Sequence, residues 1–285
     1  MVLGAFIAIF KHDLKALLAY STVSHLGLIT MLFGIGTPFA AMAAVFHIIN
    51  HFTFKAALFM TAGIVDHEAG TRDIKRLGGL RHLMPVTFVI ATLAALSMAG
   101  IPFLNGFLSK EMMLEEASHT NWLDNPLLVP VLAALGALLS AAYSYRFIAH
   151  VFLGKTRDDY PHAPHDPPFG MWAAPGLLSV LVVAIGVAPF IAEGLVTVAA
   201  SAVTGADLHP HLKIWHGVTP ALWMSIIAVG GGAALLLAHA PFDKAWIAAP
   251  RPEAKAIFDR LIALVVALSR TITEAAHNGA ISRYL

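Results

Sequence analysis

The stretch FAAMAAVFHIINHFTFKAALFMTAGIV, residues 39–65, is apolar yet contains His47, His51 and Lys55. It is long enough to cross a bilayer, which takes about 20 helical residues. Residues four apart on a helix differ by about 40° in direction and about 6 Å in height, so the three bases form one slanting row. An ionisable group at membrane depth costs at least about 2.5 kcal/mol unless it faces protein or water. The row therefore predicts a functional polar path inside a membrane.

The composition predicts a membrane protein with several spans. The 285 residues are 58% hydrophobic and 12% charged, with a mean hydropathy of +0.74, whereas soluble domains are about 25% charged. A net charge of +1 gives no general attraction to nucleic acid. The chain has no cysteine, which excludes disulfides and thiol chemistry. Lys11 and Lys15 follow the first apolar run instead of preceding it, so a signal peptide is not expected.

The apolar runs predict an all-α, polytopic helix bundle in residues 1–250. Residues 1–10 are too short to span and look like the tail of a helix. Residues 251–285 place apolar side chains on one stripe, as an amphipathic helix lying along the membrane does. The six expected spans begin at Ala16, Phe39, Pro85, Pro126, Met171 and Thr219.

The third of these spans is expected to be a discontinuous transmembrane helix. Its first half, residues 85–100, is about 24 Å long and stops at Gly100-Ile101-Pro102. The second half, FLSKEMMLEEAS at residues 107–118, carries Lys110 and Glu111 just after the break. Broken helices expose unpaired backbone groups and are tolerated where they line a cavity, which is why transporters place ion sites beside them.

The distribution of basic residues sets the expected orientation. With the broken helix counted as one crossing, eleven loop Lys and Arg lie on one side and Lys213 lies on the other. Basic loops face the cytoplasm, so we expect a multi-pass protein of the cell (inner) membrane. The eleven are Lys11, Lys15, Arg72, Lys75, Arg76, Arg81, Lys155, Arg157, Lys244, Arg251 and Lys255.

A proton relay is the function that the buried bases favour. Histidine changes charge near neutral pH, and lysine does so where its surroundings disfavour the charged form. Alternatives remain open: the histidines are neutral and packed, Lys55 extends to an interface, or Lys110 pairs with Glu111 or with Glu115.

A metal site is the alternative interpretation of HIINH. Zinc peptidases with two histidines at this spacing carry Glu after the first, where this chain has Ile48, and no third ligand presents itself. His162 and His165, in a Pro-rich loop, are expected to be solvated. Asp13 is either an ordinary acid at a helix N-terminus or part of the relay. No metal or other cofactor is expected.

Three separated motifs resemble the antiporter-like subunits shared by respiratory complex I, membrane-bound hydrogenases and Mrp-type multisubunit Na⁺/H⁺ antiporters. They are DLKALLAYSTVSHLG at residues 13–27, FHIINHFTFKAALFM at 46–60 and GIPFLNGFLSKEMML at 100–114. GIVDHEAGTRDIKRLGGL, at 63–80, looks more like the A-type subunit of the Mrp antiporter. The first half of the family fold and the extension that the A-type subunit has after HNGAISRYL are not in this sequence, so the chain looks like a fragment.

The resemblance implies a function and a set of site residues. It implies a proton-translocating subunit, not an enzyme, whose partners are other membrane subunits, the lipid bilayer, protons and a monovalent cation, with Na⁺ favoured. The rivals are a proton-pumping subunit of a redox complex and a non-conducting structural fragment. The implied positions are His47 and His51 in a central relay, Lys55 on the same helix, Lys110 as the lysine exchanging protons toward the outside, Glu111 as its acidic neighbour, and Asp13 as a carboxylate between helices at the cytoplasmic side.

Overall fold

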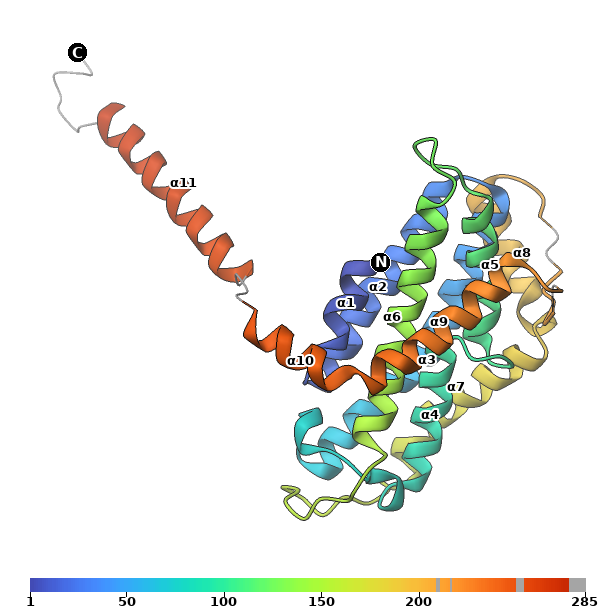
Figure 1. Ribbon diagram of the computed structural model, residues 1–285, viewed down its shortest axis with the longest axis horizontal. Coiled ribbons are helices and arrows are strands. Elements are labelled where there is room, and N and C mark those ends of the chain that lie inside the picture. The colour runs from blue at the N-terminus through green and yellow to red at the C-terminus, as the bar shows by residue number, and fades with distance from the viewer. Residues whose placement is uncertain (209–210, 216, 250–253, 277–285) are drawn as a thin grey trace. The chain divides into compact units, whose positions relative to one another are not determined.

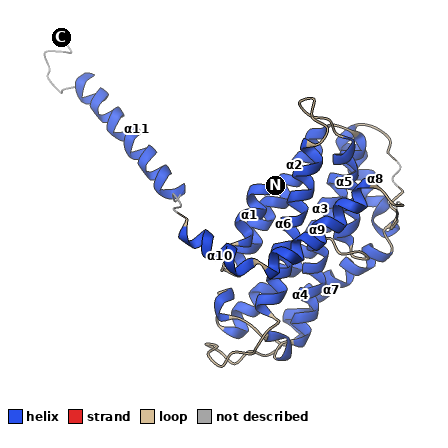
Figure 2. Ribbon diagram, in the orientation of Figure 1, coloured by secondary structure: helices blue, strands red, loops and turns tan. Residues whose placement is uncertain are grey.

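The computed structural model describes residues 1–208, 211–215, 217–249 and 254–276. These residues form helices and loops, and none of them lies in a β-strand (Figure 2). The chain divides into two compact units, Met1–Ala240 and Pro241–Leu285. The expectation of an all-α membrane bundle is confirmed.

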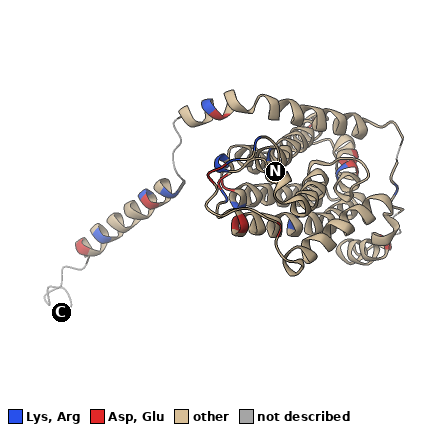
Figure 3. Cartoon of the chain, turned by 90° about the horizontal axis from the view of Figure 1, so that it is seen from below, with Lys and Arg blue, Asp and Glu red and all other residues tan. Residues whose placement is uncertain are grey.

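Eleven α-helices are present in the described residues, and they are labelled in Figure 1. Most of the ribbon carries no charged residue (Figure 3). The helices are α1 (Val2–Ile9), α2 (Leu14–Ile35), α3 (Pro38–Ala69), α4 (Pro85–Ala99), α5 (Asn105–His119), α6 (Leu128–Val151), α7 (Phe169–Val187), α8 (Phe190–Thr204), α9 (Pro220–Leu237), α10 (His239–Ala248) and α11 (Ala254–Ala276).

Five of these helices, α2, α3, α6, α7 and α9, are long and apolar enough to cross a membrane. They correspond to five of the six expected spans. The remaining span is built from α4 and α5, and the interruption falls where the sequence predicts it. Gly100 ends α4 in the left-handed conformation, at φ +90°, which glycine adopts without steric cost. Pro102 then follows, and its ring and missing N–H disfavour continuation of the helix.

Two helices, α8 and α10, were not predicted. The spans expected from Met171 and from Thr219 leave residues 190–204 in a connection, and this expectation is wrong. Pro189 lacks the N–H that would continue α7, so α7 ends at Val187 and a separate helix starts. With 15 residues α8 is about 22 Å long, too short to be recognised as a span. It packs against α3.

The polar loops at one end of the first unit meet as an alternating topology requires. Lys15 at the start of α2 forms a 2.7 Å ion pair with Asp66 near the end of α3. The backbone N–H of Gly79 donates to the carbonyl oxygen of Leu153 at 2.8 Å, which joins the α3–α4 and α6–α7 connections. We call this end, with residues 11–15, 66–84 and 152–168, the basic end; its loops are at the bottom of Figure 1.

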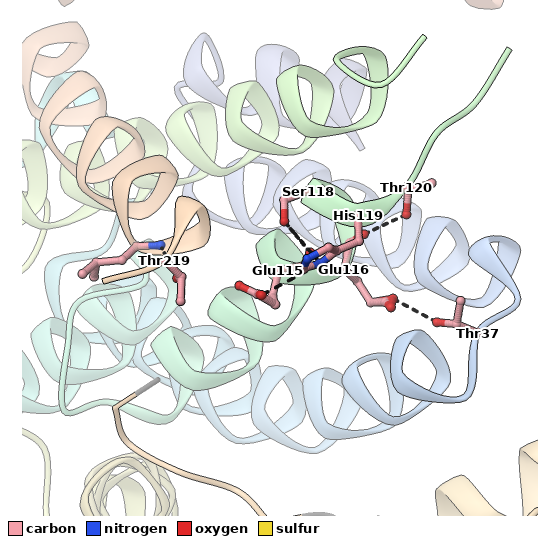
Figure 4. Close-up of polar contacts among 8 residues, drawn as sticks. Thr37, Glu115, Glu116, Ser118, His119, Thr120 and Thr219 are labelled. Atoms are coloured by element: carbon pink, nitrogen blue, oxygen red, sulfur yellow. Dashed lines mark hydrogen bonds and ion pairs between the residues drawn. The ribbon is translucent and has the colours of Figure 1, made fainter. Parts of the chain in front are cut away.

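At the opposite end, α5 is attached to the turn between α2 and α3. The Thr37 hydroxyl donates to the Glu116 carboxylate at 2.9 Å, and the Thr120 hydroxyl donates to the Glu116 backbone oxygen at 2.7 Å (Figure 4). The second half of the broken helix is therefore fixed where it ends.

The second unit contains α11, whose described side chains are exposed. Its apolar positions, among them Ile257, Leu261 and Leu264, form the stripe seen in the sequence. Residues 251–253 and 277–285, which include HNGAISRYL, lie outside the described residues. An interfacial location for α11 stays a prediction.

Candidate functional site

Three histidines meet between α2 and α3. His47 and His51 come from α3, and His25 from α2 lies against both of them. The ring centroids are 5.1 Å apart for His25 and His47, 5.0 Å for His25 and His51, and 6.1 Å for His47 and His51. His25 Nδ1 and His47 Nε2 are 2.9 Å apart and share a hydrogen bond. We call His25, His47 and His51 the histidine cluster.

Two of the three histidines are enclosed by protein, and His51 is partly buried. His47 is 0% exposed and His25 is 2% exposed, and the ring of Phe54 packs against all three imidazoles. The Nε2 atoms of His25 and His51 are buried without a hydrogen-bond partner. Buried nitrogens of this kind are places where internal water binds. The histidines thus contact one another and keep free nitrogens for proton exchange.

The cluster reaches the broken helix through one hydrogen bond. Nδ1 of His47 is 2.9 Å from the Ser109 hydroxyl on α5, and both side chains are fully buried. Ser109 immediately precedes Lys110. The hydrogen bond thus joins the histidine cluster to α5, the helix that carries Lys110.

The ammonium of Lys110 lies at the break between α4 and α5. Its Nζ donates to the backbone oxygens of Met98 at 2.6 Å and Ala99 at 3.3 Å and to the Ser140 hydroxyl on α6 at 3.0 Å. Lys110 is 4% exposed. These acceptors are all neutral, so the structure does not have the ion pair with Glu111 or Glu115 that the sequence left open.

Glu111 points toward α9 instead of the histidine cluster. The Ser225 hydroxyl on α9 donates to its Oε1 at 2.5 Å, and Glu111 is buried. A small cavity beside it is also lined by Phe39, Met112 and Glu115. Consecutive helical residues differ by about 100° in direction, which is why Lys110 and Glu111 contact different helices.

Lys55 lies on the same side of α3 as the histidines and donates to α2. Its Nζ hydrogen-bonds to the Ser21 hydroxyl and, at 3.4 Å, to the Leu18 backbone oxygen. It is 5% exposed, so it does not extend to an interface. Ser21 lies one helical turn before His25 on α2, which places Lys55 next to the histidine cluster.

Asp13 is at the basic end and caps α2. Its carboxylate accepts from the Ala16 backbone N–H at 2.8 Å and forms an ion pair with Arg72. These are the contacts of an acid at a helix N-terminus, and they join α2 to the loop after α3. A relay role for Asp13 stays a prediction.

The loop histidines also lie at the basic end. His165 Nε2 is 3.3 Å from the Glu68 carboxylate, and Nδ1 of His67 is 3.0 Å from it. Both imidazoles are exposed, and no group of three or more His, Asp or Glu suited to a metal ion occurs in the part of the chain that the structure describes.

A hydrogen-bonded group holds the break against α3. Asn105, the first residue of α5, donates to the Thr53 hydroxyl at 2.8 Å, accepts from the Ser97 hydroxyl at 2.7 Å, and accepts at its backbone oxygen from Asn50 at 2.9 Å. The Gly106 N–H donates to Ser97 Oγ at 2.9 Å. All five residues are buried. The group fixes α4, α5 and α3 in one geometry.

Asn105→Ala is expected to lower the free energy of unfolding by about 2–4 kcal/mol, because it leaves Ser97 and Thr53 buried without the partner they have now. The measurement is thermal unfolding of the detergent-purified protein. The matched control is Asn121→Ala, at an exposed loop position, which should leave the melting temperature within about 1 °C. Equal melting temperatures for the two variants would contradict the role given to Asn105.

His25 and Asn105 are the residues that the sequence analysis missed as site residues. His25 lies within the motif at residues 13–27, but it is not among the positions to which the resemblance gives a role. The feature that could have identified it is a second histidine within an apolar span, next in sequence to the span that carries His47 and His51. Asn105 had no signal of its own, because its partners are 8 and 52 positions away in sequence.

A bundle with a broken helix, a lysine at the break and a buried row of bases defines an antiporter-like membrane protein. Residues 1–136 match the family described as NADH:quinone oxidoreductase/Mrp antiporter, transmembrane. These residues belong to this family, and the chain is a multi-pass membrane protein.

Relatives and solved structures agree with this assignment. The chain is 50% identical over 239 residues to a probable A/B-type K⁺/H⁺ antiporter subunit of Rhizobium meliloti, covering 82% of this chain and 24% of the relative. It is 36% identical over 310 residues to the A-type Na⁺/H⁺ antiporter subunit of Alkalihalophilus pseudofirmus, covering 99% of this chain and 38% of the relative. The chain thus spans between about a quarter and two fifths of the length of these relatives.

The same fold occurs in two kinds of membrane complex. The Mrp complex from Dietzia sp. DQ12-45-1b aligns with a TM-score of 0.86 and 36% identity, over 99% of this chain and 31% of that chain. Respiratory complex I from Thermus thermophilus aligns with a TM-score of 0.60 and 29% identity, over 71% of this chain and 42% of that chain.

Proposed function

We propose that this chain forms a proton-translocating part of one subunit in a multisubunit monovalent cation/proton antiporter. The observation that carries the proposal is the buried hydrogen-bonded series from His25 through His47 to Ser109, which reaches α5 one residue before the buried Lys110 at the helix break. Support comes from relatives named as Na⁺/H⁺ and K⁺/H⁺ antiporter subunits. The partners proposed are other membrane subunits, protons and a monovalent cation.

Proton transfer through His47 follows from its two hydrogen bonds. In a neutral imidazole one ring nitrogen donates and the other accepts, so a proton taken up at Nε2 from His25 can be matched by one released at Nδ1 toward Ser109. We propose that protons move between Lys55 and Lys110 by way of the histidine cluster. His25 lies between His51 and His47 in this path, a step that was not expected from the row on α3 alone.

The Mrp-type antiporter is favoured over a redox-driven pump by the structural similarity. The alignment with the Mrp complex covers nearly the whole chain, including α8 and α9, whereas the alignment with complex I covers 71%. A non-conducting fragment is the remaining rival. It predicts that titratable groups in the cluster can be replaced without effect on transport, which the next experiment decides.

His47→Gln is expected to lower ΔpH-driven cation exchange at least about tenfold in vesicles containing the assembled complex, because glutamine keeps hydrogen-bonding atoms but takes up no proton. Exchange is followed with a pH-sensitive dye, and assembly is checked on native gels. The matched control is His119→Gln, at the exposed end of α5. An undiminished rate for His47→Gln, with the complex assembled, would remove the histidine cluster from the mechanism.

A further inference from the structure

The oxygens that surround the Lys110 ammonium form a site in their own right. The backbone oxygens of Met98 and Ala99 belong to the last turn of α4, and the third oxygen is the hydroxyl of Ser140. The last carbonyls of a helix have no partner within the helix. We call these three atoms the oxygen cradle.

The cradle is suited to one positive charge. The C-terminal end of a helix carries a partial negative charge, and the α4 carbonyls present that end to Lys110. Ser140 strengthens the arrangement, because its hydroxyl donates to the Met98 oxygen at 3.2 Å while it accepts from Lys110. The Tyr143 hydroxyl donates to Ser140 at 3.0 Å and fixes its orientation. A monovalent cation matches this set of oxygens without any carboxylate.

A cavity adjoins the cradle. It is large enough to hold one water molecule. Lys110 and Ser140 are among the residues that line it, and so are Ser24 and His25. A cation in the cradle therefore has space for a water ligand, and the same space connects Lys110 with the histidine cluster.

We propose that the oxygen cradle binds an alkali cation in exchange for the Lys110 proton. This inference rests on the proposed antiporter function and names the cation site of that function. Lys110 gives one proton to a water in the adjoining cavity, and the side chain of Lys110 becomes a neutral amine. The proton passes from the water to His25. The neutral amine then leaves the three oxygens and one alkali cation takes its place, so the charge in the cradle is +1 before and after the exchange.

The chemistry of the oxygens supports an alkali cation. Backbone carbonyl oxygens replace the hydration shell of such ions in channels, and broken helices of transporters coordinate Na⁺ with unwound carbonyls and half-helix C-terminal ends. Because the ammonium and the cation use the same three oxygens, they compete. In the unaltered complex, the cation concentration giving half-maximal exchange should therefore rise as the pH is lowered.

The experiment is Ser140→Cys in the assembled complex, with exchange measured in vesicles over a range of NaCl and of KCl concentrations. Sulfur keeps the size and weak hydrogen bonding of the side chain but is a poor ligand for hard cations. The half-saturating cation concentration is expected to rise about tenfold, while the maximal rate stays within about twofold. Ser140→Thr, which keeps the oxygen, should retain the original value.

The matched control is Ser144→Cys, one turn further along α6, where the hydroxyl is buried and donates to the Ser140 backbone oxygen without contacting Lys110. Unchanged half-saturation in Ser140→Cys, or an equal rise in Ser144→Cys, would overturn the cation site. A loss of maximal rate at unchanged half-saturation would also overturn it, by assigning Ser140 to proton transfer alone. The antiporter function is tested separately by His47→Gln, so the two can fail independently.

Discussion

Lys110→Met is expected to abolish ΔpH-driven exchange, leaving a rate at least about a hundredfold below that of the unaltered complex. Methionine has a similar length and fits the same buried space, but it takes up no proton and carries no charge. A positioned proton-transfer group contributes about 10²- to 10⁴-fold to a rate. Lys110 is the titratable side chain at the helix break, and its loss removes the ammonium donor from the Met98 and Ala99 oxygens.

The measurement is initial exchange rate in vesicles, normalised to the amount of assembled complex. Lys75→Met is the matched control, since Lys75 is exposed at the basic end and its substitution removes the same charge from the chain. The control should exchange at the original rate. If Lys110→Met retained more than a tenth of the original rate, Lys110 would have no required part in exchange, and both the proton path and the competition at the oxygen cradle would have to be abandoned.

The row of bases and the helix break were predictable because both depend on short-range geometry. His47, His51 and Lys55 share a side of α3 by their spacing alone. The break follows from Gly100 and Pro102, which act on the backbone where they stand. Each of these predictions depends only on the local sequence of a single helix or a single turn.

The partners of those bases were not predictable, because they depend on how helices pack. His25 contacts His47 only because α2 lies against α3, and Ser140 reaches Lys110 only because α6 lies against the break. Sequence spacing sets which side of its own helix a residue occupies, but not which helix that side meets. The alternative in which Lys110 pairs with Glu111 is not found for a related reason, since adjacent helical residues point about 100° apart.

Because adjacent residues on α5 point in different directions, this one half-helix contacts several parts of the site. On α5, Ser109 contacts His47, Lys110 contacts the end of α4 and α6, and Glu111 contacts α9. Three consecutive residues thus join the histidine cluster, the oxygen cradle and the neighbouring helix. A displacement of α5 relative to α4 changes all three contacts together, so the close approach of these two half-helices is a condition for the site.

Gly106→Ala is expected to prevent that approach and to cause loss of the assembled complex. A Cβ at position 106 would lie 2.0 Å from the backbone oxygen and 2.8 Å from the backbone carbon of Ser97. Backbone atoms of a helix cannot turn aside as a side-chain end can, so α5 must move away from α4. The shift would break the hydrogen bond from the Gly106 N–H to Ser97 Oγ and separate Asn105 from Ser97. Overpacking of this kind costs about 3 kcal/mol or more.

Gly63→Ala is the matched control, because Gly63 lies within α3 and a Cβ there meets nothing within 4 Å. Alanine is preferred over glycine inside a helix by about 1 kcal/mol, so this variant should be as stable as the original protein or more so. Yield of folded complex after detergent extraction and its melting temperature are the measurements. If the Gly106→Ala and Gly63→Ala proteins had the same melting temperature, α4 and α5 would not be held in close contact. The position given to Lys110 would then lose its structural basis.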